Sequence, residues 1–139
     1  NIFGERQKIG QFGALIPILV ERAKNGQNLT VFGDGKQGRD YSYISDIIAG
    51  YNLILGKPDL KGQVINLGSS RETKIIDIAN YIAKRFKVKV VHMPARPGEV
   101  KRFRADISLA RSLGWKPKVS IWDGIDRYIK WRLVKNPEK

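Results

Sequence analysis

The sequence contains no cysteine and only one histidine among its 139 residues. The lack of cysteine excludes disulfides and thiolate metal sites, and it fits a reducing compartment such as the cytoplasm. One histidine cannot form a multi-histidine metal site, so no metal is expected. Any Ser-His-Asp triad would have to use His92. The sequence instead favours a partly buried strand position for this residue.

Long apolar runs are lacking as well. The longest, Ala14–Val20, contains Pro17 and falls far short of the roughly 20 residues that a membrane-spanning helix needs. No charged and then apolar signal segment is present. We therefore expect a soluble, cytoplasmic chain with no membrane partner.

Acidic residues are scarce compared with basic ones. The chain has 26 Lys and Arg against 13 Asp and Glu, a formal net charge of +13. Such a balance attracts anionic partners: nucleic acid, or a discrete phosphate-bearing ligand. A charged surface of a heat-adapted protein is the plainer explanation. The basic residues are spread along the whole chain, which disfavours nucleic acid.

The hydrophobic pattern predicts alternating helices and strands with short connections, an α/β chain. The expected helices start near Leu15, at Ser45, at Thr73, after Asp106 and at the Ser120–Asp123 capping pair. The expected strands cover Leu29–Phe32, Asp40–Ile44, Val64–Leu67 and Lys89–Met93.

A glycine-rich segment, Gly33–Gly38, matches the dinucleotide-binding pattern Gly-x-Gly-x-x-Gly. That pattern has meaning only where the last glycine opens a helix whose N-terminus holds the pyrophosphate. Here the last glycine is followed by Arg-Asp-Tyr-Ser-Tyr-Ile, which alternates like a strand. We therefore predict a hairpin connection with glycines at positive φ, and no cofactor site.

A series of short motifs runs through the chain in a characteristic order. They are Asn1-Ile2-Phe3-Gly4, Leu15-Ile16-Pro17, Leu29-Thr30-Val31-Phe32-Gly33-Asp34-Gly35, Arg39-Asp40-Tyr41 with Asp46, Asn66-Leu67-Gly68, Arg96-Pro97-Gly98-Glu99, Asp106 and Leu113-Gly114-Trp115-Lys116-Pro117. Their order and spacing resemble the C-terminal half of extended short-chain dehydrogenase/reductases, the NAD-dependent nucleotide-sugar epimerases and dehydratases, with UDP-glucose 4-epimerase as the nearest type. The resemblance covers residues 1–139. It implies a small mixed α/β substrate-binding lobe, plus elements that pack on a Rossmann domain absent from this chain.

The resemblance implies that a nucleoside-diphosphate sugar is the ligand and that three residues hold its diphosphate. Asn1 matches the family's Asn-x-Tyr-Gly motif, and Arg39 and Arg96 match its two diphosphate-binding arginines. Planar, permanently charged guanidinium groups suit this role. The plainer alternatives are an ion pair of Arg39 with Asp34 or Asp40, and a simple surface role for Arg96.

The same resemblance implies contacts to the nucleoside. Glu99 matches the acidic residue that reaches the ribose hydroxyls. Thr30, Val31 and Phe32 occupy the segment that contacts the base, and Leu15 matches a backbone contact to the nucleotide.

The family's catalytic Tyr-x-x-x-Lys pair is missing. The five tyrosines are followed at the fourth position by Ser45, Ile47, Leu55, Arg85 and Arg132. The resemblance thus implies that NAD or NADP is bound by an N-terminal half outside residues 1–139, and that this chain alone is catalytically incompetent. The apolar faces of the 43–55 helix and the 64–67 strand predict association with that half or with a second copy. A nucleic-acid-binding module and a pure interaction surface remain the rival hypotheses.

Overall fold

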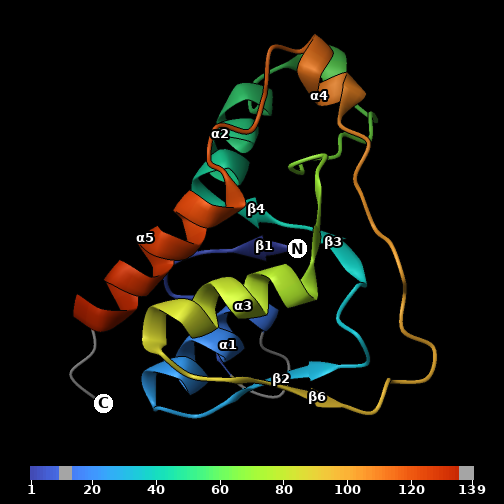
Figure 1. Ribbon diagram of the computed structural model, residues 1–139. Coiled ribbons are helices and arrows are strands. Elements are labelled where there is room, and N and C mark those ends of the chain that lie inside the picture. The colour runs from blue at the N-terminus through green and yellow to red at the C-terminus, as the bar shows by residue number, and fades with distance from the viewer. Residues whose placement is uncertain (10–13, 135–139) are drawn as a thin grey trace. The chain divides into compact units, whose positions relative to one another are not determined.

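The computed structural model describes residues 1–9 and 14–134 (Figure 1). These residues form two compact units, each assembled from stretches that are separated in sequence. Unit 1 comprises Asn1–Glu5, Asp40–Arg71 and the chain from Arg104 onward, and unit 2 comprises Arg6–Arg39 and Glu72–Phe103. None of the helices described is long and apolar enough to cross a membrane.

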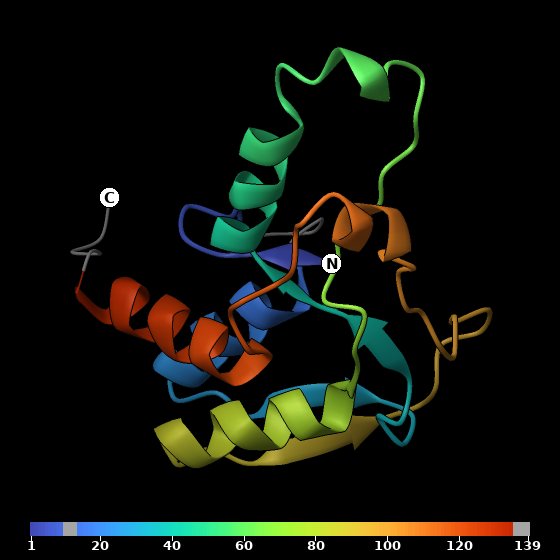
Figure 2. The same ribbon diagram turned by 90° about the horizontal axis from the view of Figure 1, so that it is seen from above.

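Unit 2 contains a parallel pair of strands, β2 (Leu29–Phe32) and β6 (Val90–Met93), in register from Leu29 opposite Val90. Two helices, α1 (Leu15–Lys24) and α3 (Ile75–Phe86), pack on each other and on β2. Figure 2 shows α3 lying along the strand pair. These elements lie where the hydrophobic pattern predicted them, although α3 begins two residues after Thr73.

The core of unit 2 follows from the two periodicities of its elements. Leu29 and Val31 are buried on one face of β2, while Thr30 and Phe32 are partly exposed on the other. The buried positions of α3 are Ile78, Ala79, Ile82 and Ala83, which recur at helical spacing.

The glycine-rich loop does not form the predicted hairpin. Its flanking strands pair with other partners: β2 with β6, and β3 (Gly38–Asp40) with β5 (Glu72–Lys74). The loop instead covers the start of α3. The N–H groups of Ile75 and Ile76 donate to the carbonyls of Gln37 at 3.1 Å and Gly35 at 2.9 Å.

The sequence predicted that Thr73 would cap α3. The contacts of the glycine-rich loop explain why it does not. Thr73 lies within β5, and no side chain caps the helix, because loop carbonyls accept its first N–H groups. Gly35 has φ +70°, and a Cβ there would lie 2.8 Å from Cβ of Ile76. Only glycine therefore fits where the loop meets the helix.

Unit 1 pairs β1 (Ile2–Phe3) in parallel with β4 (Ser42–Tyr43) and packs α5 (Ile121–Val134) against β4. The rings of Phe3 and Tyr43 meet edge to face, with centroids 5.5 Å apart. Gly124 lies against both rings, where a Cβ would come within 2.8 Å of Phe3. Burial raises the pKa of the Tyr43 hydroxyl, and its hydrogen bond to Glu5 raises it further.

The remaining elements of unit 1 are α2 (Ile44–Ile54), the short 3₁₀ turn η1 (Pro58–Leu60) and α4 (Ser108–Ser112). The predicted Ser120–Asp123 capping pair is confirmed: the Ser120 hydroxyl donates to Asp123 at 2.7 Å and accepts from its N–H at 3.1 Å. Asp106 was predicted to cap α4, but the N-cap residue is Ile107, and Asp106 lies one residue earlier, where its carboxylate accepts from the N–H and hydroxyl of Ser108. These hydrogen bonds lower the pKa of Asp106.

Several local predictions are wrong. Residues 64–67 form no strand: Val64 is 85% exposed, and Ile65 and Leu67 pack instead on the buried cluster around Trp115. The helix predicted to be capped by Ser45 begins one residue earlier, at Ile44. His92 lies in β6 as expected, but its side chain is exposed rather than partly buried.

The expected strand over Asp40–Ile44 is divided between β3 and β4. For the two strand predictions, residues 64–67 and 40–44, the deciding factor is a neighbour in space, since an apolar run becomes a strand only where another strand lies beside it.

The carboxylate of Asp40 is the main polar connection within unit 1. It is 2% exposed and accepts hydrogen bonds from the N–H and hydroxyl of Ser69, the N–H of Ser70 and the N–H of Ala105. The distances lie between 2.6 and 3.1 Å. Gly68 allows this close approach, since a Cβ there would lie 2.7 Å from Cβ of Ala105. One side chain thus joins three stretches of sequence.

We expect Asp40→Ala to destabilise the protein by at least ~3 kcal/mol, because several buried N–H groups lose their acceptor at about 1–3 kcal/mol each. Urea unfolding measures the change. The exposed Asp59→Ala serves as the control and should stay within about 0.5 kcal/mol of the parent. Equal stability of the two variants would contradict the role given to Asp40.

Candidate functional site

A cavity of about 340 Å³ lies within unit 2, beside α1 and the partly exposed face of β2. This volume is in the range of small-molecule sites. Its lining residues are Leu15, Ile18, Leu19, Arg22, Thr30, Val31, Phe32, Gln37, Ile75, Arg96 and Glu99. The cavity therefore brings together Leu15, Thr30, Val31, Phe32, Arg96 and Glu99, all of which the sequence singled out.

Glu99 and Arg39 are neighbours at this site. The Nη2 atom of Arg39 lies 3.9 Å from Oε1 of Glu99, and the side chains are 18% and 26% exposed. Nη1 of Arg39 donates to the carbonyls of Gly38 at 2.8 Å and Val100 at 2.5 Å. Arg39 is thus held by the carbonyls of Gly38 and Val100 through Nη1 and by the ion pair with Glu99 through Nη2.

Gln37 completes this network. Its Nε2 donates to the carbonyl of Phe32 at 3.1 Å and to Oε2 of Glu99 at 3.2 Å. The carboxylate of Glu99 is therefore positioned from two sides, by an amide on one oxygen and a guanidinium on the other. The hydrogen bond from Gln37 and the ion pair with Arg39 restrict the rotamers of Glu99 at the wall of the cavity.

The two plainer partners proposed for Arg39 are occupied elsewhere. Asp34 accepts the N–H of Lys36 at 2.9 Å and pairs with the Lys36 ammonium at 3.5 Å. These contacts lower the pKa of Asp34, the backbone hydrogen bond most strongly. The Asp40 carboxylate is filled by N–H and hydroxyl donors within unit 1. Glu99 is the acidic partner that Arg39 has.

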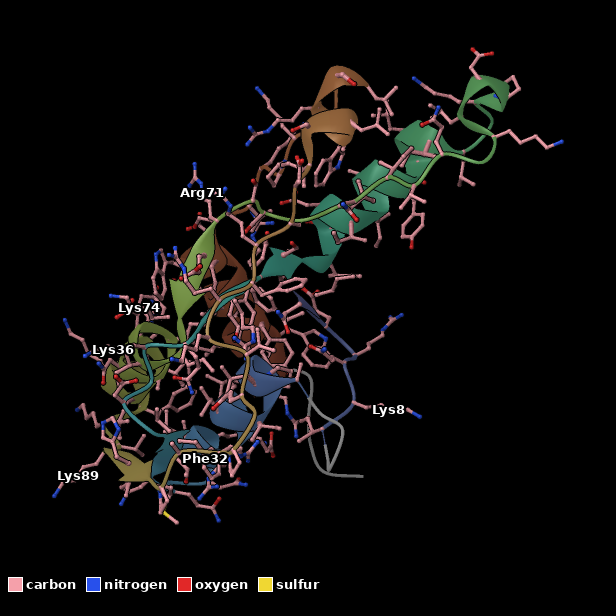
Figure 3. All side chains as sticks on the ribbon, turned by 90° about the vertical axis from the view of Figure 1, so that its right-hand side faces the viewer. Lys8, Phe32, Lys36, Arg71, Lys74 and Lys89 are labelled. Carbon is pink, nitrogen blue, oxygen red and sulfur yellow. The ribbon has the colours of Figure 1, made fainter. Side chains whose placement is uncertain are left out.

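Arg96 is exposed, as the alternative of a simple surface role predicted. Its side chain nevertheless contacts an aromatic ring. Its guanidinium carbon lies 3.6 Å from the centroid of the Phe32 ring. Figure 3 labels Phe32 on this unit. Stacking of this kind is worth about 0.5–1 kcal/mol at exposed sites. The stack holds a cation beside an aromatic surface at the cavity wall.

Two predicted residues differ from the others. Asn1 belongs to unit 1, where its Nδ2 donates to the Asp40 carbonyl at 3.2 Å. Val31 lines the cavity but is only 1% exposed, and its side chain packs near Gly35.

Five further residues line the cavity although no motif marked them as site residues: Ile18, Leu19, Arg22, Gln37 and Ile75. Leu15, Ile18, Leu19 and Arg22 follow i, i+3, i+4, i+7 spacing along α1, and that spacing was the available signal. Gln37 and Ile75 come together only through the fold of the glycine-rich loop.

The chemistry of the cavity suits the binding of an anionic ligand that carries hydroxyl groups and a flat ring. It offers guanidinium groups for an anion, a fixed carboxylate for hydroxyl donors, and an apolar wall for a flat ring. No cluster of metal-ligating side chains occurs among residues 1–9 and 14–134.

The sequence and the fold of this chain are both similar to those of known proteins. Residues 1–128 match the sequence profile of the family described as GDP-mannose 4,6 dehydratase. The chain belongs to this family. Its fold is that of the extended short-chain dehydrogenase/reductases, so the family resemblance and the α/β fold class predicted from the motifs are both confirmed.

Individual proteins of similar sequence or structure support the family assignment. A putative UDP-glucose 4-epimerase from Methanocaldococcus jannaschii is 32% identical over 98% of this chain and 44% of its own length. The crystal structure of Thermotoga maritima UDP-glucose 4-epimerase with UDP-glucose superposes with a TM-score of 0.88 at 29% identity, over 96% of this chain and 43% of that one.

UDP-glucuronic acid 4-epimerase from Bacillus cereus, in complex with UDP-glucuronic acid and NAD, gives a TM-score of 0.82 at 32% identity. It is matched over 94% of this chain and 42% of its own. The chain thus spans less than half the length of the relatives it matches.

The stack of Arg96 on Phe32 can be tested by a double-mutant cycle. We expect Phe32→Leu and Arg96→Met to show a coupling free energy of about 0.5–1 kcal/mol in urea unfolding, because each change alone removes the same contact. The matched cycle of Phe32→Leu with Lys36→Met, an exposed cation of the same unit, should show a coupling near zero. Equal coupling in both cycles would indicate a general charge effect.

Proposed function

We propose that this chain is the nucleotide-sugar-binding part of an NAD-dependent epimerase or dehydratase, with a UDP-glucose 4-epimerase-like activity as the first choice. The observation that carries the proposal is the single cavity that collects the apolar wall, Arg96 and Glu99, with Arg39 beside it. Two similar structures, one with UDP-glucose and one in complex with UDP-glucuronic acid, support it.

Each part of a nucleoside-diphosphate sugar has a matching group at the cavity. Arg39 and Arg96 supply guanidinium forks for the diphosphate. The carboxylate of Glu99, held by Gln37, can accept hydrogen bonds from ribose hydroxyls. Thr30–Phe32 and Leu15 form the wall against which a flat base can lie. Asn1 is proposed as a further diphosphate contact on the family motif alone.

The glycine-rich loop, residues 33–38, does not fit NAD. Gly38 opens strand β3 rather than a helix, and the first N–H groups of α3 already donate to loop carbonyls. The donors that a dinucleotide pyrophosphate would need at the loop are therefore occupied. We propose that NAD or NADP is held by an N-terminal half, together with the catalytic tyrosine and lysine, and that residues 1–139 alone are inactive.

The rival nucleic-acid hypothesis has less support. Lys36, Lys74 and Lys89 of unit 2 point outward in Figure 3 and are exposed. They belong to a loop, to β5 and to the segment before β6, so they do not follow a single element that could enter a groove. The family match likewise gives nucleic acid no support.

The outer face of α2 is the best candidate for contact with the proposed N-terminal half or a second copy. Ile48 is 52%, Tyr51 60% and Leu55 72% exposed, and they recur at helical spacing. Apolar side chains gathered on one helix face indicate an interaction surface. We propose that this face is covered in the complete enzyme.

The diphosphate assignment predicts the effect of removing either arginine. In the full-length protein, Arg39→Ala and Arg96→Ala should each weaken binding by about 1.5–3 kcal/mol, because charge-assisted hydrogen bonds are lost. This equals roughly 10- to 150-fold. UDP and UDP-glucose should lose affinity equally, since both carry the diphosphate. Calorimetric titration measures both, with duplex DNA as the third titrant at low and moderate salt.

Arg102→Ala is the matched control, because Arg102 lies in the same unit but pairs with Glu72 outside the cavity. It should bind UDP like the parent. If Arg39→Ala and Arg96→Ala also bind UDP like the parent, the site assignment is wrong. Binding of DNA that collapses steeply with salt, without binding of UDP, would favour the rival hypothesis.

The role of the α2 face predicts that residues 1–139 produced alone will self-associate. Ile48→Glu combined with Leu55→Glu should weaken the association about tenfold or more, since each apolar side chain contributes roughly 1.5–3 kcal/mol when buried. Sedimentation at several concentrations measures this. The exposed α3 substitution Asn80→Glu should change nothing. A monomeric parent at every concentration would contradict the proposal.

A further inference from the structure

Arg22 is the cation of the cavity that no motif identified. It lies on α1, one or two turns beyond Leu15, Ile18 and Leu19, which line the same wall. Its Nε is buried and has no hydrogen-bond partner among residues 1–9 and 14–134. A buried N–H without an acceptor is unfavourable, because its hydrogen bond to water is lost and not replaced. An acceptor from outside the chain would remove that cost.

The position of Arg22 differs from that of Arg39 and Arg96. The chain turns directly from the end of α1 into β2, with the N–H of Gln27 donating to the Arg22 carbonyl at 2.9 Å. The last turn of α1 therefore lies near the start of β2, on the side of Thr30. Glu99 and Arg96 gather at the other end of the strand, near Phe32.

We infer that Arg22 binds the base of the nucleotide and selects a base with a carbonyl oxygen opposite the ribose, such as uracil. The inference rests on the proposed function, which places the ribose at Glu99 and the ring along Thr30–Phe32. In a pyrimidine, C4 lies across the ring from the glycosidic nitrogen, so its substituent points away from Glu99 and toward Arg22.

The hydrogen-bonding chemistry of the guanidinium explains why uracil would be preferred to cytosine. Arginine carries only N–H donors and has no acceptor. The C4 carbonyl of uracil can accept from them, whereas the C4 amino group of cytosine presents another donor. A cytosine base would leave both groups unsatisfied, and sites of this kind reject such ligands strongly. A third phosphate contact is the competing role for Arg22, and it would not depend on the base.

The test compares UDP with CDP, which differ in this substituent and share the diphosphate and ribose. The full-length parent should bind UDP at least about tenfold more tightly than CDP. Arg22→Met keeps the apolar stem and removes the donors. It should weaken UDP binding about 10- to 100-fold and leave CDP binding within about twofold. Arg22→Gln, whose amide can donate or accept, should bind UDP and CDP alike.

Arg85→Met is the matched control. It removes the same charge from the exposed face of α3, where Arg85 lies over the Tyr81 ring outside the cavity, and it should keep the parent's preference for UDP. Equal losses for UDP and CDP in both Arg22 variants would place Arg22 at the phosphates and overturn the inference, as would an unchanged preference. A parent that binds neither nucleotide would instead overturn the proposed function itself.

Discussion

The buried carboxylate of Asp40 is the interaction on which unit 1 depends. A charge that is 2% exposed is tolerated only because N–H and hydroxyl donors from Ser69, Ser70 and Ala105 surround it. The next residue toward the N-terminus, Arg39, belongs to the network of unit 2. Adjacent residues of one motif thus have separate roles: the carboxylate organises a fold, and the guanidinium is available to a ligand.

The small number of acidic residues also determines the charge of the cavity. Asp34 is satisfied by Lys36, and Glu99 by Arg39 and Gln37. In a chain with 26 basic and 13 acidic residues, some cations must remain without a carboxylate partner. At the cavity these are Arg22, whose Nε has no partner in the described part of the chain, and Arg96, which stacks on an aromatic ring instead. An excess of cations facing one cavity is the physical basis for attracting an anionic ligand.

The glycine-rich loop shows how one sequence pattern can serve a different purpose. Its carbonyls, rather than its N–H groups, face the start of α3, and its last glycine begins a strand. The residues that follow the loop predicted a strand rather than a helix there, and β3 does begin at Gly38. The hairpin proposed in its place was wrong, because β2 pairs with β6, far along the chain.

The sequence by itself determined the family, the α1, β2, α3 and β6 segments, the Ser120–Asp123 cap and most of the residues at the cavity. These depend on local spacing and on short motifs, which a linear reading contains. Only the tertiary structure decided that Glu99 is held by Gln37 and Arg39, that residues 64–67 remain irregular, and that Arg22 faces the same cavity as Phe32. The reason is that hydrogen-bond partners and strand pairing join residues distant in sequence, and no local pattern encodes which of them will meet.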